Sequence, residues 1–168
     1  MRDDRHLWTP PVALHDGFNL GGARLVEIAL SRQTMISGPG ARKAGDIGWP
    51  EVVGRATYRI TLRRDRAIEV GGDVRPEGWD STKGAAVSDV SDATRVFDLS
   101  GAQAFDILKR GTEISLDQPS ASVVRLLFGI EVWLYRIKDE RTFRLHVAHA
   151  LGEALVGHLK AAAAAQKS

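Results

Sequence analysis

The sequence contains no cysteine. A thiolate nucleophile, a thiolate zinc site, a cysteine-ligated iron–sulfur cluster and a disulfide are therefore all excluded. A chain without thiols is also at home in a reducing compartment. We expect any redox chemistry associated with this protein to reside on other chains.

Long apolar runs and an excess of one charge are also lacking. No stretch approaches the roughly 20 apolar residues that a membrane span requires, and the charged start, residues 1–6, lacks the apolar run of a signal peptide. Lys and Arg number 23 against 21 Asp and Glu. The densest basic run, residues 63–66, is interrupted by an acid. We expect a cytoplasmic protein that binds neither membrane nor nucleic acid.

The middle of the chain has the pattern of a β-hairpin. Apolar and polar residues alternate from 56 to 62, which predicts a strand with one solvated face. The charged residues 63–66 would form the turn and residues 67–70 the return strand. The following segment, residues 71–84, is rich in glycine and predicts a mobile loop.

A strand over residues 94–99 should lead into a short helix. Ser100 and Gln103 have the spacing of a capping box, which predicts that the helix begins there. Gly111 lies where a left-handed residue would end the helix. Residues 123–137, divided by Gly129, predict two further strands, and the alternation at Phe143, Leu145 and Val147 predicts another.

The order of these elements predicts one domain. We expect an extended arm over residues 1–24 and a single domain over residues 25–165, which ends in a helix from about Ala150. The first strand should cover residues 25–30. With strands, helix, strands and helix in this order, we predict an α+β fold, a mainly antiparallel sheet with the helices packed on one face.

Three histidines form the first candidate site. His146 and His149 lie three residues apart at a junction between strand and helix, and His158 lies on the apolar stripe of the last helix. A lone pair of this spacing occurs often by chance, and His146 falls on the expected outward face of its strand. We favour structural roles for all three and expect no metal site.

Acidic residues and tryptophans supply the other candidates. Asp89, Asp92 and Asp98 lie near one strand, but no base or nucleophile accompanies them, so they are interpreted as solvated turn acids. Tryptophans concentrate in cores and at protein interfaces. The predicted partner contacts are therefore Trp79, in the loop over 71–84, with Trp8 and Trp49. No catalytic or cofactor-binding residue is predicted.

Residues 87–108 read VSDVSDATRVFDLSGAQAFDIL. This stretch resembles the Asp-Val-Ser segment, strand and Ser-Gly-capped helix shared by gamma subunits of heterotetrameric sarcosine oxidase and the aminomethyltransferase superfamily. The matching positions are Asp89-Val90-Ser91, Leu99-Ser100-Gly101, Ala104 and Leu108. They are turn and helix positions, so the resemblance implies a fold like the aminomethyltransferase N-terminal domain rather than catalysis. Many relatives carry histidine where this chain has Asp92, so no folate contact is assigned there.

The resemblance implies a role in a larger enzyme. By this reading the chain is a non-catalytic gamma subunit, bound to a large alpha subunit and, with beta and delta subunits, forming a heterotetramer. The complex would oxidatively demethylate an N-methyl amino acid such as sarcosine and transfer the one-carbon unit to tetrahydrofolate. FAD, FMN, NAD, zinc and tetrahydrofolate would all bind partner subunits, and no cofactor would bind this chain.

Three alternatives stay open. The chain could serve a related N-methylglutamate or N-methyl amine dehydrogenase, because the substrate contacts would lie on other chains. It could be an autonomous folate-binding, aminomethyl-transfer module. It could also be a small metal-dependent enzyme built on the histidines.

Overall fold

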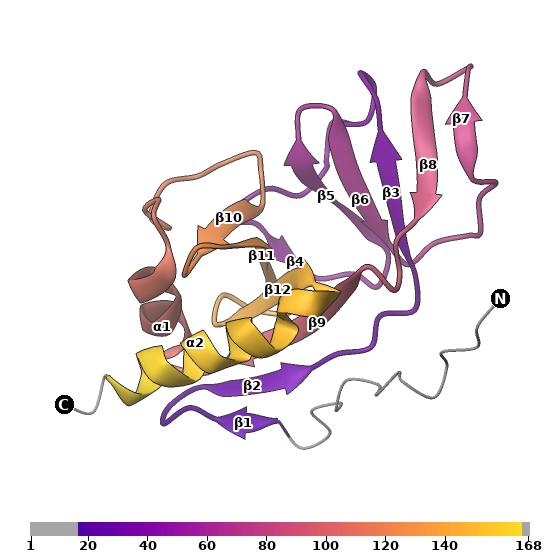
Figure 1. The fold of residues 1–168 in the computed structure, drawn as a ribbon. Helices are drawn as coiled ribbons and strands as arrows, with labels where there is room; N and C mark the ends of the chain where they lie inside the picture. The colour runs from indigo at the N-terminus through magenta and orange to yellow at the C-terminus, as the bar shows by residue number, and fades with distance from the viewer. Residues whose placement is uncertain (1–16, 166–168) are drawn as a thin grey trace, which may run out of the picture.

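The computed structural model describes residues 17–165, which form two β-sheets and two α-helices (Figure 1). The first sheet contains β1 (Phe18–Asn19), β2 (Arg24–Glu27), β9 (Thr94–Ser100), β12 (Thr142–Ala148), β11 (Ile130–Ile137) and β10 (Val124–Leu127) in that spatial order, with β4 (Val52–Val53) beside β11. The second contains β5 (Tyr58–Arg63), β6 (Arg66–Val70), β3 (Gln33–Ser37), β8 (Ala85–Asp89) and β7 (Gly78–Asp80). The helices are α1 (Ala104–Gly111) and α2 (Gly152–Ala164), the latter preceded by a 3₁₀ turn at His149–Leu151.

The seven-stranded sheet is the middle layer. Along β12, Phe143, Leu145 and Val147 face one side and pack against buried residues of both helices in one hydrophobic core. Along β11, Tyr135 and Ile137 face the other side and pack against the five-stranded sheet in a second core. The sheet is therefore covered on both faces, as Figure 1 shows for α2 and the second sheet.

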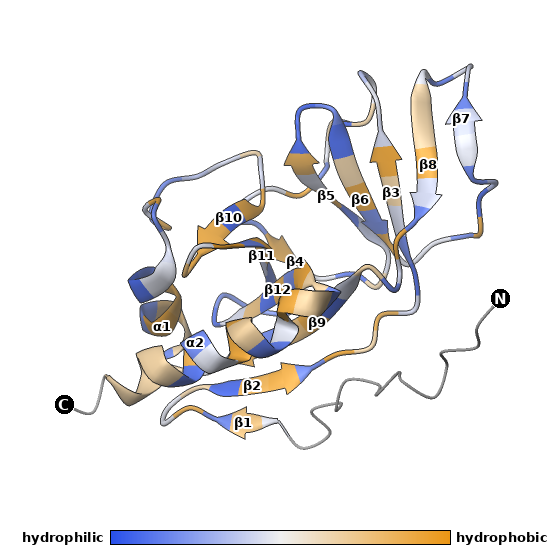
Figure 2. Ribbon diagram, viewed as in Figure 1, coloured by the Kyte–Doolittle hydropathy of each residue, from blue (hydrophilic) through white to orange (hydrophobic). Residues whose placement is uncertain are grey.

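These features confirm the predicted α+β fold. Every pairing between the named strands is antiparallel except that of β4 with β11. Both helices contribute to the same core on one face of the seven-stranded sheet. The β5–β6 hairpin is confirmed too, and Figure 2 shows its turn in the hydrophilic colour. Within residues 17–165, no helix is long and apolar enough to cross a membrane.

Some predicted boundaries were wrong. The stretch expected to be a mobile loop, residues 71–84, contains β7, which pairs with β8. The strands β3 and β8 were not predicted, although β3 is the central strand of its sheet and β8 lies beside it. The predicted arm lies mostly outside the described residues, and Phe18–Asn19 at its end forms β1. The proposed division into arm and domain stays a prediction.

The predicted capping of α1 was also wrong at both ends. Ser100 is the last residue of β9, and the N-cap position is Gln103, which makes no side-chain capping hydrogen bond. Gly111 is the last helical residue and does not have a positive φ. A Cβ atom on Gly111 would lie 2.6 Å from the Phe128 ring, so this glycine is required by close packing.

Two glycine substitutions test this explanation. We expect Gly111→Ala to lower the free energy of unfolding by about 1–3 kcal/mol, because the Phe128 ring must move. Gly157 lies exposed within α2, and a Cβ there would meet nothing within 4 Å. Gly157→Ala should raise the free energy of unfolding by about 0.5–1 kcal/mol. Urea denaturation of both variants checks the opposite signs, and equal effects would contradict the packing argument.

Candidate functional site

Strand β7 is an exposed edge of the five-stranded sheet. It lies at the end of the strand order and pairs with β8 on one side. Trp79, its central residue, is 66% exposed and belongs to none of the hydrophobic cores of the described residues. A large aromatic side chain left in water on an edge strand is typical of a binding surface. Trp79 thus lies on a strand rather than in a loop, and its exposure suits a partner contact.

The other two tryptophans proposed as partner contacts differ. Trp8 lies outside the described residues. Trp49 is 2% exposed, stacks on Phe143 with ring centroids 6.2 Å apart, and donates its indole N–H to the Leu116 carbonyl at 2.7 Å. This burial corrects the expectation for Trp49, whose ring fills the core beneath α1 and offers no surface to a partner.

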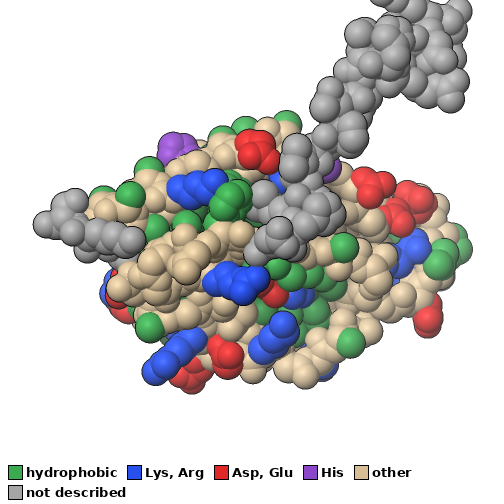
Figure 3. Space-filling model, turned by 90° about the horizontal axis from the view of Figure 1, so that it is seen from below, with side chains coloured by type: hydrophobic (Ala, Val, Ile, Leu, Met, Phe, Trp, Pro, Cys, Tyr) green, Lys and Arg blue, Asp and Glu red, His purple; other side chains and the backbone are tan. Residues whose placement is uncertain are grey.

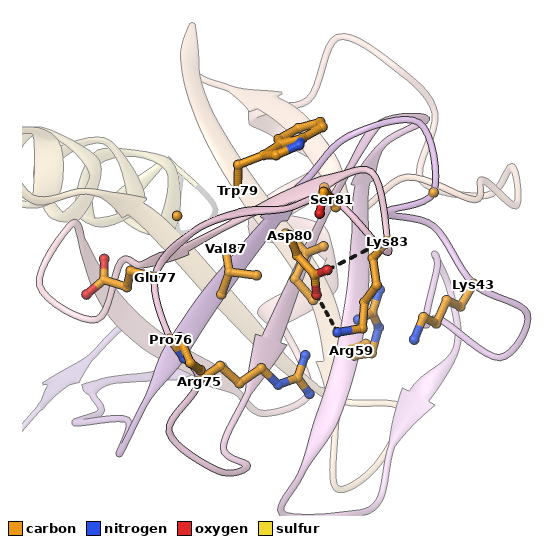
Figure 4. A pocket seen from close by; sticks show the side chains of 14 residues that line it. Lys43, Arg59, Arg75, Pro76, Glu77, Trp79, Asp80, Ser81, Lys83 and Val87 are labelled. Atoms are coloured by element: carbon orange, nitrogen blue, oxygen red, sulfur yellow. Dashed lines mark hydrogen bonds and ion pairs between the residues drawn. The ribbon is translucent and has the colours of Figure 1, made fainter.

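A cavity of about 760 Å³ lies on the outer face of the five-stranded sheet (Figure 4). Its apolar floor is formed by Ile36, Ala85 and Val87, which share one face of β3 and β8. Trp79 and Asp80 of β7 both line the cavity, and Figure 4 shows their side chains on opposite sides of the strand, as expected of successive strand residues. The two surfaces therefore adjoin along one edge strand.

Ion pairs line one wall of this cavity. Arg59 and Glu69 lie opposite each other in the register of β5 and β6, so their side chains share a face. The Glu69 carboxylate, nearly buried, lies 2.6 Å from Arg75 and 3.7 Å from Arg59. Arg59 also contacts Asp46 at 2.9 Å. The Glu69 carboxylate is thus shared by the guanidinium groups of Arg59 and Arg75.

Two lysines complete the lining. Lys83 contacts Asp80 at 2.5 Å, and this hydrogen bond, followed by that of Thr82, lowers the pKa of Asp80 to about 2. Figure 4 shows Lys43 and Arg75 extending toward one another from opposite sides. The described lining residues include no histidine, and the cavity presents cations and the acids Glu77 and Asp80 over an apolar floor.

His146 is buried between the two sheets, 1% exposed. Its Nε2 lies 2.7 Å from the Tyr135 hydroxyl and its Nδ1 lies 2.9 Å from Gln33 Oε1. The prediction of an outward, solvated His146 was wrong. The face of β12 opposite α2 is covered by the second sheet, so its polar residues are buried as well.

The hydrogen bonds around His146 run in one direction. Gln33 donates its amide N–H₂ to the Ser91 carbonyl, so its Oε1 must accept from His146 Nδ1–H. Nε2 then accepts from Tyr135, whose oxygen accepts from Tyr58 at 2.8 Å. Tyr58 in turn accepts from Arg144 at 3.2 Å. This buried polar chain joins the two sheets.

The chain is not equipped for proton transfer at neutral pH. Burial, and next the positive charge of Arg144, lower the pKa of His146 to about 3. Burial, and next Tyr58, raise the pKa of Tyr135 well above its ordinary value. Both groups are therefore neutral at pH 7. We interpret the chain as a structural link.

The other two histidines are exposed and lie apart from His146. His149 is in the 3₁₀ turn, and His158, on α2, stacks on Phe128 with ring centroids 5.4 Å apart. Within residues 17–165, no group of three or more His, Asp or Glu side chains could hold a metal ion. The structure thus does not bring the three histidines together.

The three acids behave differently. Asp92 is exposed, and Asp89, exposed at the end of β8, has its pKa lowered by hydrogen bonds from Ser91. The interpretation as solvated acids is confirmed for these two and wrong for Asp98. Asp98 is 6% exposed and accepts two hydrogen bonds from Arg144, at 2.7 and 2.8 Å. Its strand, β9, is central in the middle layer.

Strand patterns in the sequence indicated several charged and polar residues whose positions were not predicted. Arg59 and Glu69 are polar residues on opposite strands of a predicted hairpin, and pairing them would have indicated a charged face. Arg144 and His146 alternate with apolar residues, and so does Asp98 on β9. What no pattern in the sequence shows is that a second sheet covers them.

These features define a two-sheet α+β protein with both helices on one outer face and an exposed edge strand on the other sheet. The same fold is found in a chain of the heterotetrameric sarcosine oxidase from Corynebacterium sp. U-96, solved in complex with pyrrole 2-carboxylate. The match has a TM-score of 0.65 and 18% sequence identity, and covers 90% of this chain and 89% of that chain. No protein-family model and no curated protein sequence matches.

Proposed function

We propose that this chain is a non-catalytic gamma-type subunit of a heterotetrameric, sarcosine-oxidase-like complex. The observation that carries the proposal is a fold shared with a chain of such an enzyme over 90% of this chain and 89% of that one. A likeness over nearly the whole of both chains is typical of equivalent subunits. It is less typical of one domain within a larger enzyme.

The features of the described residues are those expected of a non-catalytic, structural subunit. The buried polar chain is closed to solvent and uncharged at His146, and three of the four cations that line the cavity on the second sheet are paired with acids. Trp79 leaves a large aromatic surface exposed. Binding of a partner over that surface would stabilise the assembled state by mass action.

The chemistry would belong to the partners. By this proposal an alpha subunit is the most direct contact, with beta and delta subunits completing the complex. These chains would carry FAD, FMN, NAD, zinc and tetrahydrofolate and would demethylate an N-methyl amino acid such as sarcosine. A related N-methylglutamate or N-methyl amine dehydrogenase would use the same assembly.

Native mass spectrometry tests the assembly. The tagged chain is recovered from its own cells at low salt, the intact complex is weighed, and each subunit and cofactor is identified. We expect three companion subunits and bound flavin. A free monomer under these conditions would overturn the proposal, and the identity of the flavin subunit's substrate would separate oxidase from dehydrogenase.

Replacement of Trp79 tests the contact surface. We expect Trp79→Ala to weaken assembly about tenfold or more, because truncation of an aromatic anchor removes a large contact area. Its thermal unfolding should stay close to that of the wild-type chain, since the indole packs on no core. Leu151→Ala, at a 42% exposed apolar residue preceding α2, is the control. Equal affinities of the Trp79 and Leu151 variants for the partner subunits would exclude Trp79 from the interface.

A further inference from the structure

We propose that the cavity on the outer face of the five-stranded sheet binds a small monocarboxylate with an apolar tail. Its floor is apolar, with Ile36, Ala85 and Val87 side by side in the register of β3 and β8. Its volume of about 760 Å³ is within the range of ligand sites. This inference is independent of the proposed assembly.

The charges around the cavity select an anion. Four cations line it, Lys43, Arg59, Arg75 and Lys83. Three of them are engaged by the carboxylates of Asp46, Glu69 and Asp80. Of the acids named as lining residues, Asp80 is held by Lys83, and Glu77 accepts a hydrogen bond from the Asp89 amide. Figure 4 shows the Glu77 carboxylate pointing away from Lys43.

Lys43 carries the remaining positive charge. Its ammonium group has no carboxylate within ion-pair distance in the part of the chain that the structure describes. Arg75 contacts Glu69 through Nη2 alone, which leaves further donors on its guanidinium facing Lys43 across the cavity. A carboxylate between the two would accept from both.

The balance of charge also limits the class of ligand. Among the described residues, Lys43 is the one lining cation without an acid partner, and the Glu77 carboxylate points away from it, so the site suits a monoanion better than a phosphate dianion. The apolar floor would cover an alkyl chain rather than a polar sugar. The favoured ligand is therefore a short or medium-chain organic acid.

Titration calorimetry with hexanoate tests the site. We expect saturable, millimolar binding at one site, with hexanamide and hexylamine failing to bind. Affinity should rise about three- to fourfold for each methylene from butyrate to hexanoate, because each buried methylene contributes about 0.8 kcal/mol. Amide chemical shifts of Ile36, Ala85 and Val87 should move on titration.

Lys43→Gln is the discriminating variant, since Lys43 is exposed and its loss should not unfold the chain. We expect hexanoate affinity to fall about fivefold or more. Lys109→Gln, at a lysine paired with Asp117 elsewhere on the surface, should leave it unchanged. Absence of saturable binding, or equal binding by both variants, would overturn the proposal while leaving the proposed assembly untouched. If an acidic side chain of a partner occupies the cavity instead, the isolated chain would bind hexanoate and the assembled complex would not.

Discussion

Asp98→Ala should lower the free energy of unfolding by about 3–5 kcal/mol, the largest effect that we expect from a single substitution in this chain. The Asp98 carboxylate accepts two hydrogen bonds from the Arg144 guanidinium, and both side chains are nearly buried. Burial lowers the pKa of Arg144, but the hydrogen bonds and charge of Asp98 outweigh it, so Arg144 stays charged. Without Asp98, this charge would be buried with no acid beside it.

Two further variants make the measurement decisive. Glu131 pairs with Arg63 in a bridge that is more than half exposed, so Glu131→Ala should cost less than about 1 kcal/mol. The double variant Asp98→Leu with Arg144→Met replaces both charges by apolar groups and should recover most of the loss. Urea denaturation of all three is the assay. If Asp98→Ala cost no more than Glu131→Ala, the buried pair between β9 and β12 would not have the stabilising role assigned to it.

The second large effect is a loss of stability in acid that depends on His146. The pKa of His146 is about 3 in the folded chain, against 6.5 for an ordinary histidine. Between these values the unfolded chain binds a proton that the folded chain does not. The stability contributed by neutral His146 is therefore complete above about pH 6.5 and is lost as the pH falls toward 3.

The expected slope is about 1.4 kcal/mol per pH unit, so the wild-type chain should lose about 2 kcal/mol between pH 8 and pH 5 from this residue. Denaturation curves at pH 8, 6 and 5 measure it. His146→Gln should reduce stability at pH 8, because Tyr135 and Gln33 lose their partner, and should show a flatter dependence on pH. His149→Gln, at an exposed histidine, should keep the wild-type slope. The same slope in all three proteins would refute the assignment.

Charge on the surface gives no comparable effect. On the face shown in Figure 3, acidic and basic side chains lie interspersed without a large patch of one sign. Exposed pairs such as Lys109 with Asp117 contribute little in water. The electrostatic contributions that matter most to stability are therefore buried between the sheets.

Local patterns determined much of the fold in advance. The β5–β6 hairpin was recognised from its alternation and charged turn, and the strands β10, β11 and β12 from apolar runs divided by glycine or charge. Helix α2 followed from leucines four residues apart. In each case the signal lies within a few neighbouring residues. The short strands β1, β3, β4, β7 and β8 gave weaker signals and were missed.

The tertiary structure alone decided which faces are buried. Alternation in β12 correctly separated Phe143 from Arg144, yet it could not reveal that a second sheet covers the polar side. For that reason Asp98 and His146 were expected in water and are found in the interior. Likewise Trp49 and Trp79 are the same residue type, and only the packing of distant segments places one in a core and the other on an edge. A sequence pattern reports what a strand's two faces prefer, whereas burial depends on what the rest of the chain lays against them.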